Sequence, residues 1–316
     1  MLKQKQLGRS DIFLPPIVFG GNVFGWTADT AASFKLLDEA LEHGLNAVDT
    51  ADAYSRWAPG HAGGESEAII GVWMKERRNR DKVIVATKVG LDLGPGKTGL
   101  SKARITYAVE ASLIRLQTDY IDLYQAHKDD EATPLEETLS AFADLIKAGK
   151  VRTIGASNYT APRLKAALDV SRANNFPRYE SLQPLYNLME RPAFEAELAP
   201  LCAAENIGVI NYFALAAGFL TGKYRSEADL AKSPRGAGLK GYLNEKGLRM
   251  LAALDEQAQK LNATPAQVAI AWNIAKPGIT APIASATSLT QLEGLAKAAS
   301  LHLDEAAMQA LDAASA

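Results

Sequence analysis

The chain has 316 residues, and its 34 basic against 36 acidic side chains give a formal net charge of −2 at pH 7. A hydrophobic content of 47% with 22% charged residues is that of an ordinary globular protein and excludes wholesale disorder. The balanced charge argues against nucleic-acid binding, because neutralising phosphates needs a clustered basic excess. No apolar segment follows the charged N-terminus, and the longest apolar stretch, 209–220, is too short to span a bilayer. We therefore expect a cytoplasmic protein with no membrane partner.

Short β-rich runs alternate with longer segments of helical periodicity along the whole chain. Strands are predicted near 17–19, 47–50, 83–87, 121–125, 153–156, 181–183, 209–212 and 281–284. Helices are predicted near 30–42, 66–77, 103–116, 135–148, 161–174, 192–205, 245–261 and 289–298. Such alternation indicates parallel βαβ units, and the absence of a linker predicts one (β/α)8 TIM barrel domain over residues 1–316.

Two segments depart from this regular pattern. Residues 3–14 place Gly8-Arg9-Ser10-Asp11 between two short alternating runs, which predicts an N-terminal β-hairpin across the bottom of the barrel. Residues 223–244 form a long polar stretch rich in Gly and Lys. A loop of that length inside a compact domain is usually functional or mobile.

Several familiar motifs fail on inspection. The run 236–241 matches G-x-G-x-x-G but follows Lys-Ser-Pro-Arg and not a strand, so it does not predict a Rossmann nucleotide site. Gly96-Lys97-Thr98 lacks the glycine that a P-loop needs at position 91. We expect no metal site, because the four histidines are far apart in sequence and none stands in a ligand spacing: His43, His61, His127 and His302. A hydrolase with paired carboxylates is disfavoured, since Asp129 and Asp130 follow the fourth predicted strand but residues 212–215 after the seventh offer no acidic partner.

Four polar side chains are predicted to meet at one end of the barrel. Asp49, Lys88 and His127 each follow a predicted strand, and Tyr54 lies on the loop after Asp49. Taken singly, each has an ordinary structural explanation, such as an ion pair or a packed ring. Their convergence at the C-terminal strand ends, where barrels of this type carry their active sites, favours a catalytic tetrad.

Six segments of the chain, in order, resemble the signature segments of the aldo-keto reductase superfamily. They are 46–54, 85–88, 119–127, 149–158, 183–187 and 218–224. The resemblance implies a nicotinamide-dependent reduction of an aldehyde or ketone to an alcohol. It implies that Tyr54 donates the proton, that Lys88 strengthens this acid by favouring the phenolate, that Asp49 holds Lys88, and that His127 orients the carbonyl oxygen.

The resemblance also implies an extended dinucleotide across the top of the barrel. Ser157, Asn158 and Gln183 would bind the carboxamide, Tyr212 would stack on the nicotinamide, and the polar stretch 223–244 would be a flap. Phe213 stands where the family often has Ser, which removes a polar contact and narrows the pocket. No basic residue lies between 285 and 291 to hold the adenosine 2′-phosphate, so NADP(H) is expected to be preferred over NAD(H) by a small margin. The full set of predicted cofactor contacts is Gly21, Asn22, Ser157, Asn158, Gln183, Tyr212, Phe213, Leu215, Gly218, Lys223, Ser285, Thr287 and Gln291.

Aromatic residues on the first two loops predict an apolar mouth for hydrophobic or aromatic carbonyl substrates: Phe24, Trp26 and Trp57. The main alternative is a cofactor-binding regulatory or channel-associated subunit of the same fold with little turnover. A tetrad is compatible with both functions, so the sequence leaves them open. It also leaves the oligomeric state open and is compatible with a monomer.

Overall fold

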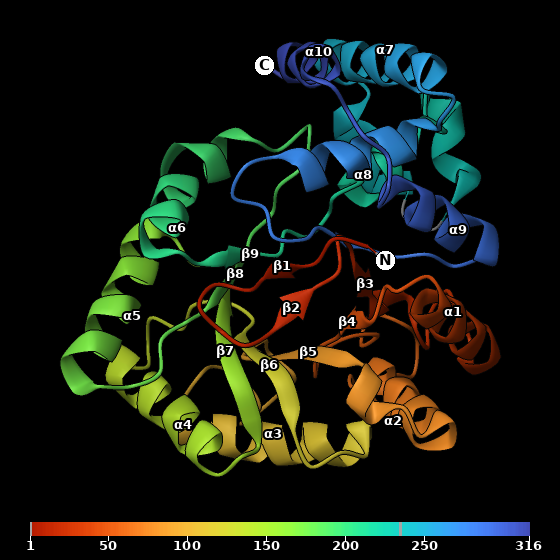
Figure 1. Cartoon of the computed structure of the whole chain (residues 1–316). Helices are drawn as coiled ribbons and strands as arrows, with labels where there is room; N and C mark the ends of the chain where they lie inside the picture. The colour runs from red at the N-terminus through yellow and green to blue at the C-terminus, as the bar shows by residue number, and fades with distance from the viewer. Residues whose placement is uncertain (1, 234–235) are drawn as a thin grey trace.

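Eight parallel strands form the centre of the molecule in a computed structural model, which describes residues 2–233 and 236–316. In chain order they are β3 (Val18–Gly20), β4 (Ala47–Asp49), β5 (Ile84–Val89), β6 (Ile121–Ala126), β7 (Val151–Ser157), β8 (Ser181–Gln183), β9 (Gly208–Val209) and β10 (Ile283–Ala284). From β3 to β9 each strand pairs with the next, and β10 pairs with β3. The last gap is bridged where Ile283 N donates to Asn211 O at 2.8 Å. The predicted (β/α)8 barrel is therefore confirmed (Figure 1).

The predicted N-terminal hairpin is also confirmed. Strands β1 (Lys5–Gln6) and β2 (Phe13–Leu14) pair in antiparallel fashion and cross one end of the barrel (Figure 1). The hairpin residues Leu7, Ile12 and Leu14 are buried against inward-facing residues of the strands, so they seal this end. The opposite end, where the strands finish, is the one left for a site.

Helices surround the barrel, and seven of the described α-helices start at a side-chain cap, which supplies an acceptor for an otherwise unpaired backbone N–H group. Caps of this kind are Asp29, Ser101, Thr160, Asn244, Thr264, Ser288 and Asp304. The helices are α1 (Thr30–Glu42), α2 (Glu65–Arg77), α3 (Lys102–Leu116), α4 (Leu135–Lys147), α5 (Ala161–Asn174), α6 (Ala199–Glu205, entered from a π-helical turn at Phe194–Leu198), α7 (Glu245–Lys260), α8 (Pro265–Ala275), α9 (Leu289–Ala298) and α10 (Glu305–Ala314). No described helix is long and apolar enough to cross a membrane.

Helices α8 and α10 were not predicted, which corrects the expectation of eight helices. Helix α8, and not α7, precedes β10 and packs beside the barrel, whereas α7 packs against α8 and α10 (Figure 1). The reason is that α8 is apolar on nearly every side and therefore has no amphipathic period. The sequence does mark the start of α8, because Thr264 and Gln267 form a capping box and Pro265 stands in the first turn.

The polar stretch 223–244 is more regular than a plain loop. Two short 3-10 helices, Glu227–Lys232 and Gly236–Tyr242, occupy much of it. The second covers the G-x-G-x-x-G run, whose conformation is thus unlike a Rossmann turn. Pro234 and Arg235, inside the predicted flap, lie outside the described residues.

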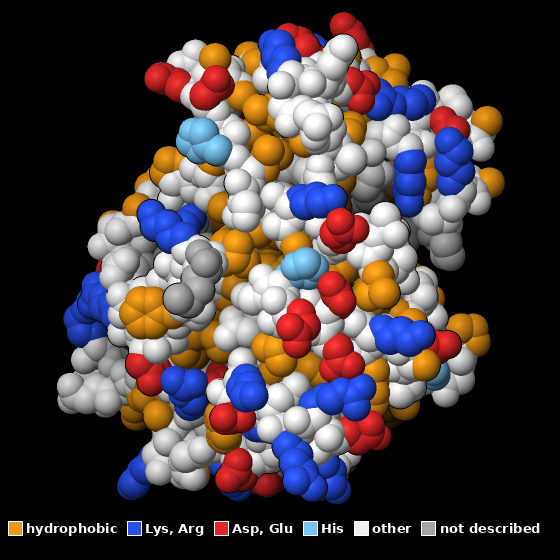
Figure 2. All heavy atoms as spheres, turned by 45° about the vertical axis from the view of Figure 1, so that its right-hand side comes forward, with side chains coloured by type: hydrophobic (Ala, Val, Ile, Leu, Met, Phe, Trp, Pro, Cys, Tyr) orange, Lys and Arg blue, Asp and Glu red, His pale blue; other side chains and the backbone are white. Residues whose placement is uncertain are grey.

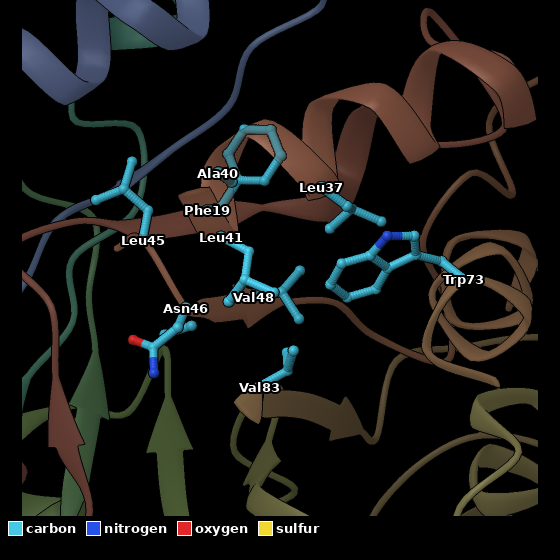
Figure 3. A pocket seen from close by; sticks show the side chains of 10 residues that line it. Phe19, Leu37, Ala40, Leu41, Leu45, Asn46, Val48, Trp73 and Val83 are labelled. Atoms are coloured by element: carbon cyan, nitrogen blue, oxygen red, sulfur yellow. The ribbon is translucent and has the colours of Figure 1, made fainter. Parts of the chain in front are cut away.

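The space between the barrel wall and helices α1 and α2 holds a small apolar cavity (Figure 3). Phe19, Leu37 and Trp73 line it, and its volume is about 10 Å³. Such a space holds one water at most, and nine of the ten residues that line it are apolar, the exception being Asn46. This cavity is a packing void and not a ligand site.

The surface carries both signs of charge side by side. On the face shown in Figure 2, basic and acidic side chains are interspersed and no single-sign patch dominates. This pattern fits the net charge of −2. Nothing on this face would steer a polyanion by charge.

Helices α2 and α3 approach so closely at Gly71 that a side chain has no room there. A Cβ on Gly71 would lie 2.1 Å from the Arg115 carbonyl oxygen. We expect Gly71→Ala to lower the free energy of unfolding by about 1–3 kcal/mol, although helix propensity alone favours alanine. Urea unfolding measures this. Gly294→Ala in α9, where the nearest atom is 4.0 Å away, is the matched control and should stabilise the protein slightly; equal effects of the two changes would contradict the packing argument.

Candidate active site at the strand C-termini

The ammonium group of Lys88 is the centre of the site. Asp49 closes β4, and Lys88 lies on the adjacent β5, so parallel pairing brings both side chains to the same end of the barrel. Lys88 Nζ donates to Asp49 Oδ2 at 2.7 Å, to Tyr54 OH at 2.8 Å and to the Thr50 carbonyl at 2.9 Å. The lysine is fully buried and all three of its N–H donors are used. The structure thus brings three members of the predicted tetrad into direct contact.

Tyr54 is both acceptor and donor in this arrangement. Its hydroxyl accepts from Lys88 and donates to Asp49 Oδ2 at 2.9 Å. Burial, followed by the Asp49 carboxylate, raises the pKa of Tyr54 well above its usual value. The phenol therefore keeps its proton at neutral pH. That Lys88 strengthens this acid stays a prediction, and its ammonium is in hydrogen-bond contact with the phenol oxygen.

His127 stands beside Tyr54 at the end of β6. Its backbone N–H donates to the Val89 carbonyl at 2.8 Å, and its ring lies edge-on to the Tyr54 ring with centroids 6.0 Å apart. Burial, followed by the Lys88 charge, lowers the pKa of His127 well below its usual value, so the imidazole is neutral. Its Nδ1 has no hydrogen-bond partner among the described residues. A neutral imidazole has one N–H donor and one acceptor nitrogen, so it can donate a hydrogen bond to a polar ligand.

Four of the predicted cofactor residues form one hydrogen-bonded chain that begins at Asp49. Gln183 Nε2 donates to Asp49 Oδ1 at 2.9 Å, and Ser157 Oγ donates to the Gln183 carbonyl at 2.8 Å. Asn158 Nδ2 donates to Ser157 Oγ at 3.0 Å, and Tyr212 OH donates to Asn158 Oδ1 at 2.8 Å. This series of hydrogen bonds therefore runs across the ends of β7 and β8 to the segment after β9.

The segment after β9 has an unusual backbone. Phe213, Ala216, Ala217 and Gly218 all have positive φ, at 58°, 47°, 54° and 103°. Non-glycine residues adopt this region at a cost and do so mostly at functional sites. Leu215 lies within this turn, and Lys223 lies exposed beyond it, with its Nζ 5.0 Å from the centre of the Tyr224 ring.

The remaining predicted cofactor residues meet where β10 lies beside β3. Ser285 Oγ donates to Asn22 Oδ1 at 2.6 Å, and adjacent Gly21 cannot carry a Cβ without approaching the Asp49 carbonyl to 2.9 Å. Gln291 Oε1 accepts from Thr287 N at 2.8 Å and from Thr287 Oγ1 at 3.2 Å. This end of α9 is neutral, with hydroxyl and amide groups as its polar atoms.

A family model for the aldo/keto reductase family matches residues 16–316. The chain belongs to this family. It is similar to the uncharacterized oxidoreductase YrpG of Bacillus subtilis (strain 168), with 35% identity over 97% of this chain and 94% of that protein. It is also similar to the aldo-keto reductase YhdN of the same organism, with 36% identity over 91% and 84%. A probable voltage-gated potassium channel subunit beta of Arabidopsis thaliana is 32% identical over 94% and 91%. As a member of the aldo/keto reductase family, the chain is an oxidoreductase.

Two tryptophans form an aromatic wall beside the tetrad of this family member. Trp57 is half-exposed, with its ring centroid 5.9 Å from that of Tyr54, and Trp26 packs edge-on against it at 5.8 Å. Phe24 is different: it is fully buried and packs against Phe19. We therefore correct the expectation that Phe24 lines the mouth, because its ring supports the loop from beneath.

Several groups that contact or support the tetrad were not predicted from the sequence. The Thr50 carbonyl holds Lys88, and the backbone offers no signal of this in the sequence. Asp52 forms a buried ion pair with Arg104 of α3 at 2.7 Å. The sequence did offer a signal for Asp52, because this residue lies in the same segment, 46–54, as Asp49 and Tyr54. No group of three or more His, Cys, Asp or Glu residues among 2–233 and 236–316 is placed to hold a metal ion.

The Lys88–Asp49 pair makes the stability of the protein depend on both charges. We expect Lys88→Met to lower the free energy of unfolding by about 3–5 kcal/mol, because it leaves a buried carboxylate without its counter-charge. Adding Asp49→Asn to Lys88→Met removes the unpaired charge and should restore part of the loss, so the two changes are not additive. Urea unfolding of the two single variants and the double variant measures this. A Lys88→Met protein as stable as the wild type would show that the site is hydrated and not dry.

Proposed function

We propose that this protein is an NADP(H)-dependent reductase of aldehydes and ketones, with Tyr54 as the proton donor. One observation carries the proposal: a buried phenol is hydrogen-bonded to the Lys88 ammonium, and the His127 ring lies edge-on beside it. Those are the groups needed to bind a carbonyl oxygen and give it a proton. The same proposal holds that residues 1–316 form one domain and that the protein acts in the cytoplasm.

The residues of the chain supply the proton while the nicotinamide supplies hydride. In the resting arrangement the Tyr54 proton points to Asp49 Oδ2, so the hydroxyl must rotate toward the mouth to protonate a carbonyl oxygen. Lys88 stays on the phenol oxygen and stabilises the negative charge that develops there as the proton leaves. His127 donates to the carbonyl oxygen and fixes its position before transfer.

The residues at the strand ends fit a nicotinamide dinucleotide. Asn158 and Gln183 present amide groups, and Tyr212 presents a half-buried ring, at the end of the barrel that holds Tyr54. The left-handed turn through Ala216–Gly218 exposes backbone between small side chains, as an anion-binding turn requires. Ser285, Thr287 and Gln291 would face the adenosine phosphate. Gly21 and Asn22 complete the rim, and Lys223 would pair with the pyrophosphate.

The aromatic wall supports hydrophobic or aromatic carbonyls as the substrate class. Trp57 exposes 46% of its surface beside Tyr54, and Phe213 exposes 48% beside Tyr212. Large exposed rings next to a reacting group favour flat apolar partners. Trp26 holds Trp57 in place by its edge-on contact.

A regulatory subunit that binds cofactor with little turnover is the second candidate. The similarity to a protein of Arabidopsis thaliana named as a probable potassium channel subunit beta favours it. The two candidates differ in one measurement, the consumption of reduced nicotinamide with a panel of aromatic aldehydes. Tight NADPH binding without turnover on any of them would favour the regulatory role.

Replacing Tyr54 with Phe should slow reduction by on the order of 10² to 10⁴, because the ring is kept while the proton donor is lost. The affinity for NADPH, measured by fluorescence titration, should not change. The matched control is Tyr107→Phe, which alters an exposed hydroxyl on α3 and should leave turnover unchanged. A Tyr54→Phe protein with near wild-type kcat on an accepted aldehyde would refute the assignment.

NADPH should be preferred over NADH by a small margin. The backbone N–H and the hydroxyl of Thr287 both donate to Gln291 Oε1. A phosphate that binds here has to displace this amide oxygen, and the donors that it then meets are neutral. A guanidinium would discriminate more, and each tenfold preference corresponds to about 1.4 kcal/mol. We therefore expect Thr287→Arg to widen the gap.

The measurement is kcat/KM for both cofactors at several salt concentrations. Thr106→Arg, which adds the same charge at an exposed position on α3, is the control and should leave the ratio unchanged. Equal values for the two cofactors, or a preference for NADH, would show that Ser285, Thr287 and Gln291 do not form a phosphate site.

A further inference from the structure

A second buried ionic cluster lies behind the tetrad, between β5 and helices α2 and α3. Arg104 pairs with Asp52 at 2.7 Å, and the two side chains are 5% and 2% exposed. Arg115 pairs with Glu67 at 2.6 Å, and Glu67 also accepts from Thr87 Oγ1 at 2.6 Å. Thr87 and Lys88 are neighbours on β5 and point to opposite faces. The cluster and the tetrad are therefore separated by one strand.

Asp52 connects the cluster to the loop that carries the proton donor. It lies between Asp49 and Tyr54, and its backbone N–H donates to the Lys88 carbonyl at 3.2 Å. The carbonyl of Thr50, on the same loop, accepts from Lys88 Nζ. Lys88 therefore holds the inner side of this loop, while Arg104 holds its outer side through the Asp52 carboxylate.

The Asp52 carboxylate depends on Arg104 for its charge. Burial, followed by the nearby Glu67 carboxylate, raises the pKa of Asp52 to about 7, against the opposing effect of Arg104 and Arg115. Asp52 Oδ1 and Arg104 Nε have no partner among the described residues. The pair is thus poorly solvated and held by a single close contact. The other groups facing it are Lys88 on β5 and the buried Tyr124 hydroxyl on β6.

We propose that Arg104 is a positioning residue for carbonyl reduction: its ion pair with Asp52 fixes the loop 50–54 so that the Tyr54 hydroxyl stays on Lys88 Nζ. Arg104 itself touches neither substrate nor cofactor. This inference rests on the proposed reductase function. A displacement of the donor by about 1 Å is enough to slow a positioned reaction by on the order of 10².

Arg104→Met and Arg104→Lys test the inference against a matched control. We expect Arg104→Met to lower kcat on an accepted aldehyde about 10- to 100-fold. KM and the NADPH dissociation constant should not change, and Arg104→Lys should recover most of the rate. The control is Arg80→Met, which removes one of the two arginines paired with the buried Asp122 at the opposite ends of the strands, the other being Arg152. It should lower the melting temperature without changing kcat.

Asp52→Asn provides a second variant that keeps an oxygen acceptor for Arg104 but does not titrate. The kcat of the wild type should rise with pH and show an inflection near pH 7, because the Asp52 carboxyl gains its charge there and can then pair with Arg104. This inflection should be absent in Asp52→Asn. A profile that is the same in both proteins would mean that the Asp52 charge does not reach Tyr54.

Amide hydrogen exchange tests the loop without relying on activity. In Arg104→Met the peptide covering residues 50–57 should exchange faster than in the wild type, and in Arg80→Met it should not. If the wild type reduces no carbonyl, the proposed function fails and exchange still decides the inference. Unchanged exchange in Arg104→Met, or an equal loss of kcat in Arg80→Met, would overturn it.

Discussion

An ammonium group taken out of water must find an oxygen for each of its protons, and Lys88 finds three within one segment of chain. Asp49, Thr50 and Tyr54 supply them, so the end of β4 and the loop after it are shaped around one buried charge. Burying that charge without these partners would cost far more than the pair contributes. The position of the phenol follows from this requirement.

The same requirement sets the protonation states of the site. Burial, followed by the Asp49 carboxylate, raises the pKa of Tyr54, and burial, followed by the Lys88 charge, lowers the pKa of His127. The phenol is therefore protonated and the imidazole neutral, and both are ready to donate a hydrogen bond. In the proposed mechanism the phenol must hold its proton until hydride arrives, and the raised pKa of Tyr54 favours that state.

Closure of the barrel concentrates these groups at one end. The N-terminal hairpin seals the other end with Leu7, Ile12 and Leu14. Small inward-facing residues such as Ala47 and Ala86 fill the interior beneath Lys88. The residues of the tetrad meet where the strands finish, and the helices behind them carry the ion pairs that hold the loops. The aldo/keto reductase family places its chemistry on loops supported in this way by a rigid scaffold.

The sequence by itself determined the barrel, the hairpin and the strand-end positions of Asp49, Lys88 and His127, because alternation and element order are local properties. Only the tertiary structure showed that Phe24 is buried, that α8 is an apolar helix beside β10, and that Thr287 is held by Gln291. It also showed that Asp52 pairs with Arg104, 52 positions further along the chain. The direction of a side chain and the protonation of a buried group depend on neighbours from distant segments, and a linear pattern does not contain those contacts.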